Sequence, residues 1–129
     1  MRALIVDDSA VMRKVVERAL RQAGIDLSEV LQAGNGAQAL EALRNNEPPD
    51  LIISDINMPG MDGLQFLEQC RSEGLAPGVP VFMITTESSA PLVLRAIAAG
   101  ARGYICKPFT PDQFRARVVP LLNRSHASA

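Results

Sequence analysis

The chain has 129 residues, of which 47% are hydrophobic, and its net charge is −1. This is the size and composition of one globular domain with a sizeable core, and its 13 lysines and arginines are spread over several segments, so no basic patch indicates binding to nucleic acid. No apolar run approaches the roughly 20 residues of a membrane span, and the two cysteines form neither a CxxC pair nor a disulfide framework, so we expect a cytoplasmic protein without membrane insertion.

Five short, largely apolar runs recur along the chain. They are RALIV at 2–6, EVLQA at 29–33, DLIIS at 50–54, PVFMIT at 80–85 and GYIC at 103–106. Runs of this length and composition are typical of strands that are buried on both faces, as in a parallel sheet covered by helices.

Amphipathic patterns between these runs predict five helices. The first begins after Ser9, its expected N-cap, and the next three begin near Asn35, after Asp62 and after Ser88. The fifth opens with Thr110-Pro111, a cap followed by proline at the first helical position. The residues expected to face inward are Met12, Val15, Val16, Ala19, Leu20, Leu40, Leu43, Leu64, Leu67, Cys70, Leu92, Val93 and Ile97. Five strands that alternate with five helices predict a (βα)5 α/β fold, a doubly wound five-stranded parallel sheet.

The last helical pattern contains Pro120. Because proline lacks an amide proton and clashes with the preceding turn, it should kink or end this helix, and we interpret it as fraying near the C-terminus. We expect one domain over residues 1–123, followed by a flexible tail over 124–129 that holds the only histidine, His126.

Polar side chains follow four of the predicted strands. Asp7 and Asp8 follow the first, Asp55 follows the third, Thr85 ends the fourth and Lys107 follows the fifth. Each residue alone is ordinary at the end of a strand. Because ligands of open parallel sheets bind beyond the carboxyl ends of the strands, the set together predicts a functional site there.

Charge balance indicates what this site binds. Three neighbouring carboxylates repel one another unless cations keep them ionised, and Lys107 offsets only one charge. An all-oxygen set suits Mg²⁺, with Mn²⁺ as the alternative, whereas zinc would favour His or Cys. With the ion and Lys107 beside it, Asp55 is a candidate nucleophile toward a phosphoryl group.

The turn after Asp55 is consistent with a metal site. In Asn57-Met58-Pro59-Gly60, the proline and glycine fix a path that can direct a backbone carbonyl toward the ion. Gly63 allows a close approach at the start of the next helix, whereas Met58 and Met61 are expected to fill the core.

The motifs IVDDS, SDINMPGMDG, MITTES and GYICKPF resemble, in order and spacing, those of the receiver domain of two-component response regulators. The resemblance covers nearly the whole chain and is strongest to the CheY-like single-domain chemotaxis regulators. It implies the flavodoxin-like strand order 2-1-3-4-5, for which CheY is itself a standard example, so this order comes from the resemblance and not from the hydrophobic pattern.

The resemblance also implies a role for each residue of the site. Asp55 is the expected phosphoacceptor, which takes a phosphoryl group from the phosphohistidine of a sensor histidine kinase, and Lys107 is expected to pair with the phosphoryl oxygens. The expected direct Mg²⁺ ligands are Asp8, Asp55 and the main-chain carbonyl of Asn57, and Asp7 is expected to bind the ion through water.

The resemblance further implies a conformational switch. Thr85 is the expected switch hydroxyl, which moves toward the phosphoryl group, and Tyr104 is the expected aromatic residue that turns inward in response. Asn57 and Glu87 are expected to tune the lifetime of the phosphoryl group, and the peptide bond before Pro108 is expected to be cis.

The expected output is contact with a downstream protein through the fourth helix, fifth strand and fifth helix. Receivers of DNA-binding regulators often carry an acidic pair before the strand-five aromatic residue, where this chain has Ala101-Arg102-Gly103, so we expect a monomer. The resemblance implies self-catalysed phosphorylation and dephosphorylation only, and no other enzymatic activity.

Several alternatives stay open at this point. The chain could be a phosphate sink or relay, or a receiver cut from a larger regulator. A Mg²⁺-dependent aspartate-nucleophile phosphohydrolase would need a second aspartate two residues after the nucleophile, where this chain has Asn57. A flavodoxin-like flavin carrier would need a phosphate-binding loop after the first strand, where two aspartates would repel phosphate.

Overall fold

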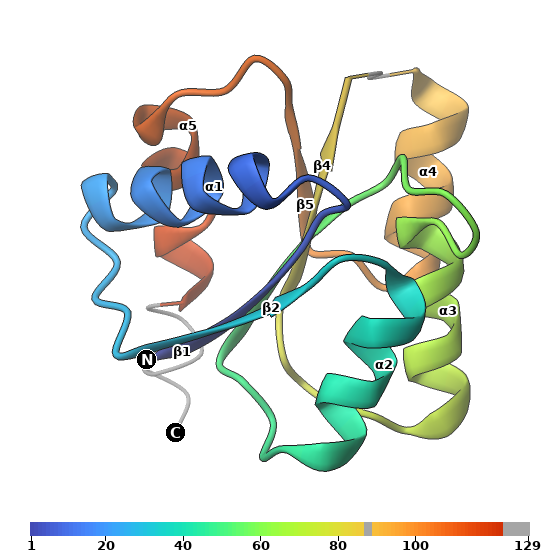
Figure 1. Cartoon of the computed structure of the whole chain (residues 1–129). Coiled ribbons are helices and arrows are strands. Elements are labelled where there is room, and N and C mark those ends of the chain that lie inside the picture. Colours follow the sequence, from blue (N-terminus) through green and yellow to red (C-terminus); the bar gives the residue numbers. More distant parts are fainter. Residues whose placement is uncertain (87–88, 123–129) are drawn as a thin grey trace.

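Five parallel strands form one sheet in the computed structural model of the chain, which describes residues 1–86 and 89–122 (Figure 1). The strands are β1 (Arg2–Val6), β2 (Glu29–Ala33), β3 (Leu51–Asp55), β4 (Val81–Thr85) and β5 (Gly103–Cys106). They lie in the order β2-β1-β3-β4-β5, and each neighbouring pair is parallel. The predicted doubly wound sheet and its strand order are therefore confirmed.

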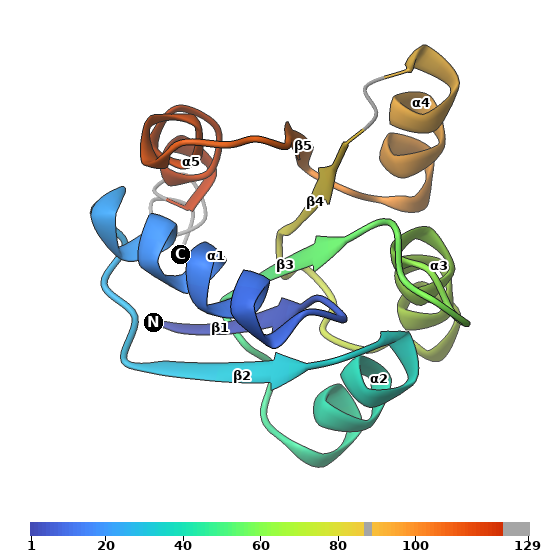
Figure 2. The same cartoon turned by 45° about the horizontal axis from the view of Figure 1, so that its top comes forward.

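Helices cover both faces of the sheet. They are α1 (Ala10–Gln22), α2 (Gly36–Asn45), α3 (Gly63–Glu73), α4 (Ala90–Ala99) and α5 (Pro111–Arg117). Helices α1 and α5 lie on one face, and α2, α3 and α4 on the other (Figure 2). Over residues 1–86 and 89–122, none of the helices combines the length and the apolar composition needed to cross a membrane.

The alternation of side chains along the strands divides the core into two layers. In β1, Leu4 and Val6 pack beneath α2 and α3, whereas Ala3 and Ile5 pack beneath α1 and α5. Strands β3 and β4 are buried along their whole length, as predicted. Strands β2 and β5 are partly exposed, so the prediction of burial on both faces is wrong for them, because as edge strands they have a neighbour on one side only.

Side-chain caps start the first three helices where the sequence predicts them. Ser9, Asn35 and Asp62 accept hydrogen bonds from the backbone N–H groups three residues later, at 3.2, 2.8 and 2.8 Å. At α3 the Gln65 side chain accepts the Asp62 N–H in return, which completes a capping box. The fourth helix begins after Ser89, and Ser88, after which the sequence predicts its start, lies outside the described residues.

Two residues predicted to face the core are exposed instead. Val15 on α1 is 42% exposed and Ile97 on α4 is 55% exposed. Successive helical residues point about 100° apart, and it is the neighbours Val16 and Ala96 that are buried. The sheet therefore meets each helix on one flank of its apolar stripe, and on α4 it meets small alanines.

Helix α5 ends at Arg117, three residues before Pro120. The Val118 N–H still donates to the Phe114 carbonyl at 2.8 Å, but the next bond, from the Leu121 N–H to the Val118 carbonyl at 3.1 Å, spans only three residues. Pro120 has no N–H to continue the α-helical pattern, but residues 119–122 are helical again and the Leu122 N–H donates to the Val118 carbonyl at 3.1 Å. The predicted break therefore lies at Val118, and the interpretation of fraying is wrong for residues 119–122. The predicted tail over 124–129 lies outside the described residues.

Candidate functional site

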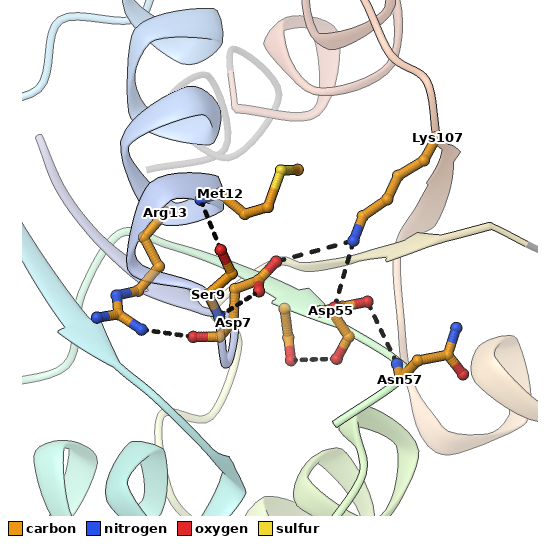
Figure 3. Close-up of polar contacts among 8 residues, drawn as sticks. Asp7, Ser9, Met12, Arg13, Asp55, Asn57 and Lys107 are labelled. Atoms are coloured by element: carbon orange, nitrogen blue, oxygen red, sulfur yellow. Dashed lines mark hydrogen bonds and ion pairs between the residues drawn. The ribbon is translucent and has the colours of Figure 1, made fainter. Parts of the chain in front are cut away.

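Three of the polar residues predicted to converge, Asp7, Asp55 and Lys107, lie together at the carboxyl edge of the sheet (Figure 3). The Lys107 Nζ atom is 3.3 Å from Asp55 Oδ2 and 3.9 Å from Asp7 Oδ2. Lys107 follows β5 directly, and its backbone N–H donates to the Thr85 carbonyl at 2.8 Å. The ends of β1, β3 and β5 thus bring charged side chains into one cluster, and a backbone hydrogen bond ties Lys107 to the end of β4.

Three carboxylates of this cluster are close enough to share one metal ion. Asp7, Asp8 and Asp55 each offer an oxygen, and these oxygens lie within 4.8 Å of one another. Asp7 and Asp55 are only 2% and 4% exposed, whereas Asp8 is open to solvent. Two buried acids with an exposed acid beside them form a negatively charged cluster, which a cation from solvent would meet first at Asp8.

One carboxylate oxygen of Asp7 is poorly satisfied. Its Oδ1 accepts the Ser9 N–H at 2.9 Å, but its buried Oδ2 accepts no hydrogen bond from any described residue, and Lys107 at 3.9 Å is too distant for one. Burial raises the pKa of Asp7 and the Asp55 charge adds to this rise, while the Ser9 hydrogen bond and Lys107 oppose it. A divalent cation with its bound water would provide the missing partner.

Arg13 fixes the backbone beneath the acids, which the sequence did not reveal. Its Nη1 donates to the main-chain carbonyl of Asp7 at 2.6 Å, and its Nε donates to the Gln32 side chain at 2.9 Å. The guanidinium thus connects the end of β1 to β2 and binds the Asp7 main chain, not its carboxylate. The only sequence signal is a polar residue beside the apolar stripe of α1, which does not identify its partners.

The loop after β3 is folded tightly against the phosphoacceptor candidate. The Asn57 N–H donates to Asp55 Oδ1 at 3.2 Å, and the Gly63 N–H donates to the Ile56 carbonyl at 2.9 Å. A Cβ atom at Gly63 would collide with the Asp55 carbonyl oxygen and would lie 2.9 Å from the Ile56 Cα. The predicted close approach at Gly63 is therefore confirmed, and Met58 and Met61 pack in the core as predicted.

The proposed switch residues lie on β4 and β5. Thr85 is 1% exposed, and the register pairs Met83 with Tyr104. Tyr104 is half-buried, and the Arg117 guanidinium carbon lies 5.3 Å from the centre of its ring. The sequence reasoning missed Arg117 as well.

Two further predictions concern the peptide bond before Pro108 and the position of Glu87. The Lys107-Pro108 peptide bond is cis. Glu87, which the resemblance suggests as a residue that tunes phosphoryl lifetime, lies outside the described residues.

The donor set fits Mg²⁺. It consists of carboxylates, with one buried oxygen that lacks a hydrogen bond from the described residues. Hard oxygen ligands suit Mg²⁺, and the exposed Asp8 leaves room for the waters that this ion retains. Among the described residues, only Lys107 forms ion pairs with these carboxylates, so one positive charge faces three negative ones and a divalent ion would restore the balance.

Comparisons with known proteins agree with this geometry. A family model described as the response regulator receiver domain matches residues 3–119. The chain is 38% identical over 122 residues to a chemotaxis protein CheY homolog of Campylobacter jejuni, covering 95% of this chain and 92% of that protein. It is also 38% identical over 122 residues to the chemotaxis protein CheY1 of Helicobacter pylori, covering 95% and 97%.

Solved structures give the same result. Chemotaxis protein CheY4 of Vibrio cholerae superposes with a TM-score of 0.77 at 36% identity, covering 95% of this chain and 96% of that one. A CheY-like receiver domain protein of Methanospirillum hungatei gives a TM-score of 0.83 at 28% identity, covering 99% and 98%. The chain therefore belongs to the response regulator receiver domain family of two-component systems, and its relatives include CheY chemotaxis proteins.

Proposed function

We propose that this receiver is a phosphorylation-controlled switch, in which Asp55 accepts a phosphoryl group from a sensor histidine kinase and the altered surface binds a downstream protein. The observation that carries the proposal is the position of Lys107, 3.3 Å from Asp55 Oδ2, beside a buried Asp7 oxygen without a hydrogen bond from the described residues. The CheY relatives support a role in chemotaxis, and a cytoplasmic location follows from this proposal.

Asp55 is held in place for nucleophilic attack. Its Oδ1 accepts the Asn57 N–H and its Oδ2 accepts from Lys107, so the side chain does not have to be reoriented when the donor arrives. A carboxylate oxygen forms the new bond to phosphorus while the phosphorus–nitrogen bond of the donor phosphohistidine breaks. The electron pair of that bond stays on the imidazole, and the product is an acyl phosphate on Asp55.

Lys107 balances the charge that accumulates on the transferred group. Its ammonium is already directed at the acceptor, and its side chain is 21% exposed, so it can follow the phosphoryl oxygens without a large loss of solvation. Positioned charge of this kind commonly accounts for much of the catalytic effect in phosphoryl transfer.

Asp7, Asp8 and Asp55 would hold Mg²⁺, or Mn²⁺ in its place, together with the Asn57 main-chain carbonyl. Asp7 would bind through water, and that water would donate the hydrogen bond that its buried Oδ2 lacks. When bound, the ion supplies positive charge beside the acceptor oxygen and the incoming phosphoryl group.

The switch would run through Thr85 and Tyr104 to the surface formed by α4, β5 and α5. The Thr85 hydroxyl and the Tyr104 ring would favour an active arrangement that exists at low population before phosphorylation. On α4, Leu94 and Ile97 are 66% and 55% exposed, which offers a partner protein apolar contacts. Asn57 and Glu87 would tune how long the phosphoryl group persists, and the protein would act as a monomer.

The site does not favour turnover of other phosphate esters. A phosphohydrolase of the aspartate-nucleophile class needs a carboxylic acid two residues after the nucleophile, and Asn57 stands there. An amide cannot donate a proton to a leaving alcohol as a general acid does. Self-catalysed phosphorylation and dephosphorylation are the only reactions that we propose.

Intact-mass spectrometry after incubation with acetyl phosphate and Mg²⁺ tests the proposal. The wild type should gain one phosphoryl group, and Asp55→Asn or a chelator should abolish the gain. Asp26→Asn is the matched control, because Asp26 is exposed and lies outside the acidic cluster. Absence of both an adduct and beryllofluoride binding in folded wild-type protein would overturn the proposal.

A further inference from the structure

The Tyr104 ring and the Arg117 guanidinium contact each other. The Arg117 Cζ atom is 5.3 Å from the ring centroid, within the range of about 6 Å in which a cation is attracted to an aromatic face. Arg117 is exposed and forms no ion pair with a described carboxylate. The Tyr104 ring is therefore the partner that the described residues offer to its guanidinium.

The two side chains originate on opposite faces of the sheet. Helix α5 packs with α1, through Phe114 and Val118, whereas Tyr104 packs against the core layer beneath α2, α3 and α4. Figure 2 shows α5 and α4 on either side of β5, which is the last strand of the sheet. Arg117 thus reaches past the open edge of β5, and the contact holds the tyrosine ring at that edge.

The same geometry places Thr85 within reach of Tyr104. Side chains alternate along a strand, so Thr85 shares a face with Met83, and Met83 is in register with Tyr104. The spacings of a parallel sheet separate Thr85 and Tyr104 by roughly 8 Å between Cα atoms, a distance that a tyrosine side chain can span. For the ring to move from the edge toward Thr85, it has to leave the Arg117 guanidinium.

We propose that Arg117 is a positioning residue that holds Tyr104 at the sheet edge and so sets the resting balance of the switch, an inference that rests on the proposed function of Tyr104. A ring turned toward Thr85 would no longer face the guanidinium, so the contact would favour the resting state. Its loss shifts the balance toward the inward state and raises, by the same factor, the affinity for any ligand that prefers that state. A cation–π contact at an exposed position corresponds to a shift of about two- to fivefold.

The composition of the chain allows a direct measurement. Tyr104 is the only tyrosine and there is no tryptophan, so intrinsic fluorescence excited near the tyrosine band reports on this ring alone. Acrylamide quenching of the free protein measures how well the ring is covered. Beryllofluoride is a stable mimic of the phosphoryl group. Its titration in the presence of Mg²⁺ measures how strongly the position of the ring is coupled to binding at the phosphoryl site.

In Arg117→Ala, acrylamide should quench the Tyr104 fluorescence less than in the wild type, because the ring lies inward more often. The variant should bind beryllofluoride about two- to fivefold more tightly, although it removes a positive charge. Arg117→Lys should restore part of the wild-type behaviour, because it retains a cation. Arg102→Ala is the matched control, since Arg102 is an exposed arginine next to β5 and its loss changes the net charge equally; it should behave like the wild type. In a Tyr104→Leu background, calorimetry should show no effect of Arg117→Ala on binding.

The outcomes separate the two levels of the proposal. Unchanged quenching and unchanged affinity in Arg117→Ala, with a wild type that binds beryllofluoride, would overturn the role of Arg117 and leave the proposed function intact. An equal change in Arg102→Ala would assign the effect to net charge and likewise overturn it. A wild type that binds no beryllofluoride would reject the proposed function, and the role of Arg117 with it.

Discussion

Lys107 and Asp55 are 52 residues apart in the chain, yet the ammonium and the carboxylate face each other at 3.3 Å across the carboxyl edge of the sheet. The contact depends on the strand order, because β4 separates β3 from β5. The Lys107 side chain crosses above the end of β4 to reach both buried acids. The sheet thus places one positive charge at the predicted acceptor.

Removal of this charge should slow phosphorylation more than it affects folding. Lys107→Ala is expected to lower the initial rate of phosphorylation by acetyl phosphate roughly 10²-fold, the typical loss when one preorganised charge-stabilising group is removed. Time-resolved intact mass measures the rate, and Lys14→Ala, an exposed lysine on α1, is the control. A Lys107→Ala rate equal to that of the wild type would show that the lysine has no part in the transfer.

The Asp7 carboxylate should lower the free energy of unfolding when no divalent ion is present. Its Oδ2 is buried without a hydrogen bond from the described residues, and burial raises its pKa above the ordinary value of 3.8. In metal-free buffer, Asp7→Asn is therefore expected to raise the free energy of unfolding by on the order of 1 kcal/mol near neutral pH. Urea unfolding in the presence of a chelator measures the gain, with Asp26→Asn as the control.

The pH dependence of this gain has a defined sign. A carboxyl group with a raised pKa binds more protons in the folded state than in the unfolded state, so its contribution to stability is greatest at low pH and is lost as the pH rises through the raised value. The advantage of Asp7→Asn should consequently be small near pH 4 and should grow toward pH 7. An advantage that stays constant over this range would contradict the assignment of the raised pKa to Asp7.

Mg²⁺ should offset the loss of stability that the acidic cluster causes in the metal-free protein. A ligand that binds only the folded state adds about 1.4 kcal/mol to the free energy of unfolding at ten times its Kd. Thermal unfolding should therefore shift upward with Mg²⁺ in the wild type and much less in Asp8→Asn, because Asp8 is one of the three carboxylates that can share the ion. Equal shifts in the two proteins would place the binding of Mg²⁺ elsewhere.

The sequence was sufficient to locate the strands and the cluster of acids because both signals are local. Buried strands are short aliphatic runs, and the residue at the end of each run is placed by the run itself, so Asp55 and Lys107 could be assigned to one edge once the sheet was taken as parallel. The strand order itself came from the resemblance to receivers and not from periodicity.

The orientation of side chains could not be predicted in the same way. An apolar stripe on a helix is wide enough for the sheet to meet either flank, which is why Val15 and Ile97 were assigned to the core and are exposed. Arg13 and Arg117 contact a backbone carbonyl and an aromatic ring on other elements. Nothing in the periodicity of a single helix identifies such partners.

Gly63 should be irreplaceable for steric reasons. A Cβ atom there would collide with the Asp55 carbonyl oxygen and crowd the Ile56 Cα, and both obstacles are backbone atoms that cannot rotate away. Gly63→Ala is expected to cost about 1–3 kcal/mol in unfolding free energy and to slow phosphorylation, because the strain displaces the residue that carries the acceptor. Gly34→Ala is the matched control, since its new Cβ would meet chiefly the flexible side chain of Gln38, at 3.1 Å. Similar stability and phosphorylation rates for the two variants, measured by urea unfolding and intact mass, would show that the β3–α3 loop is not held as tightly against Asp55 as the structure indicates.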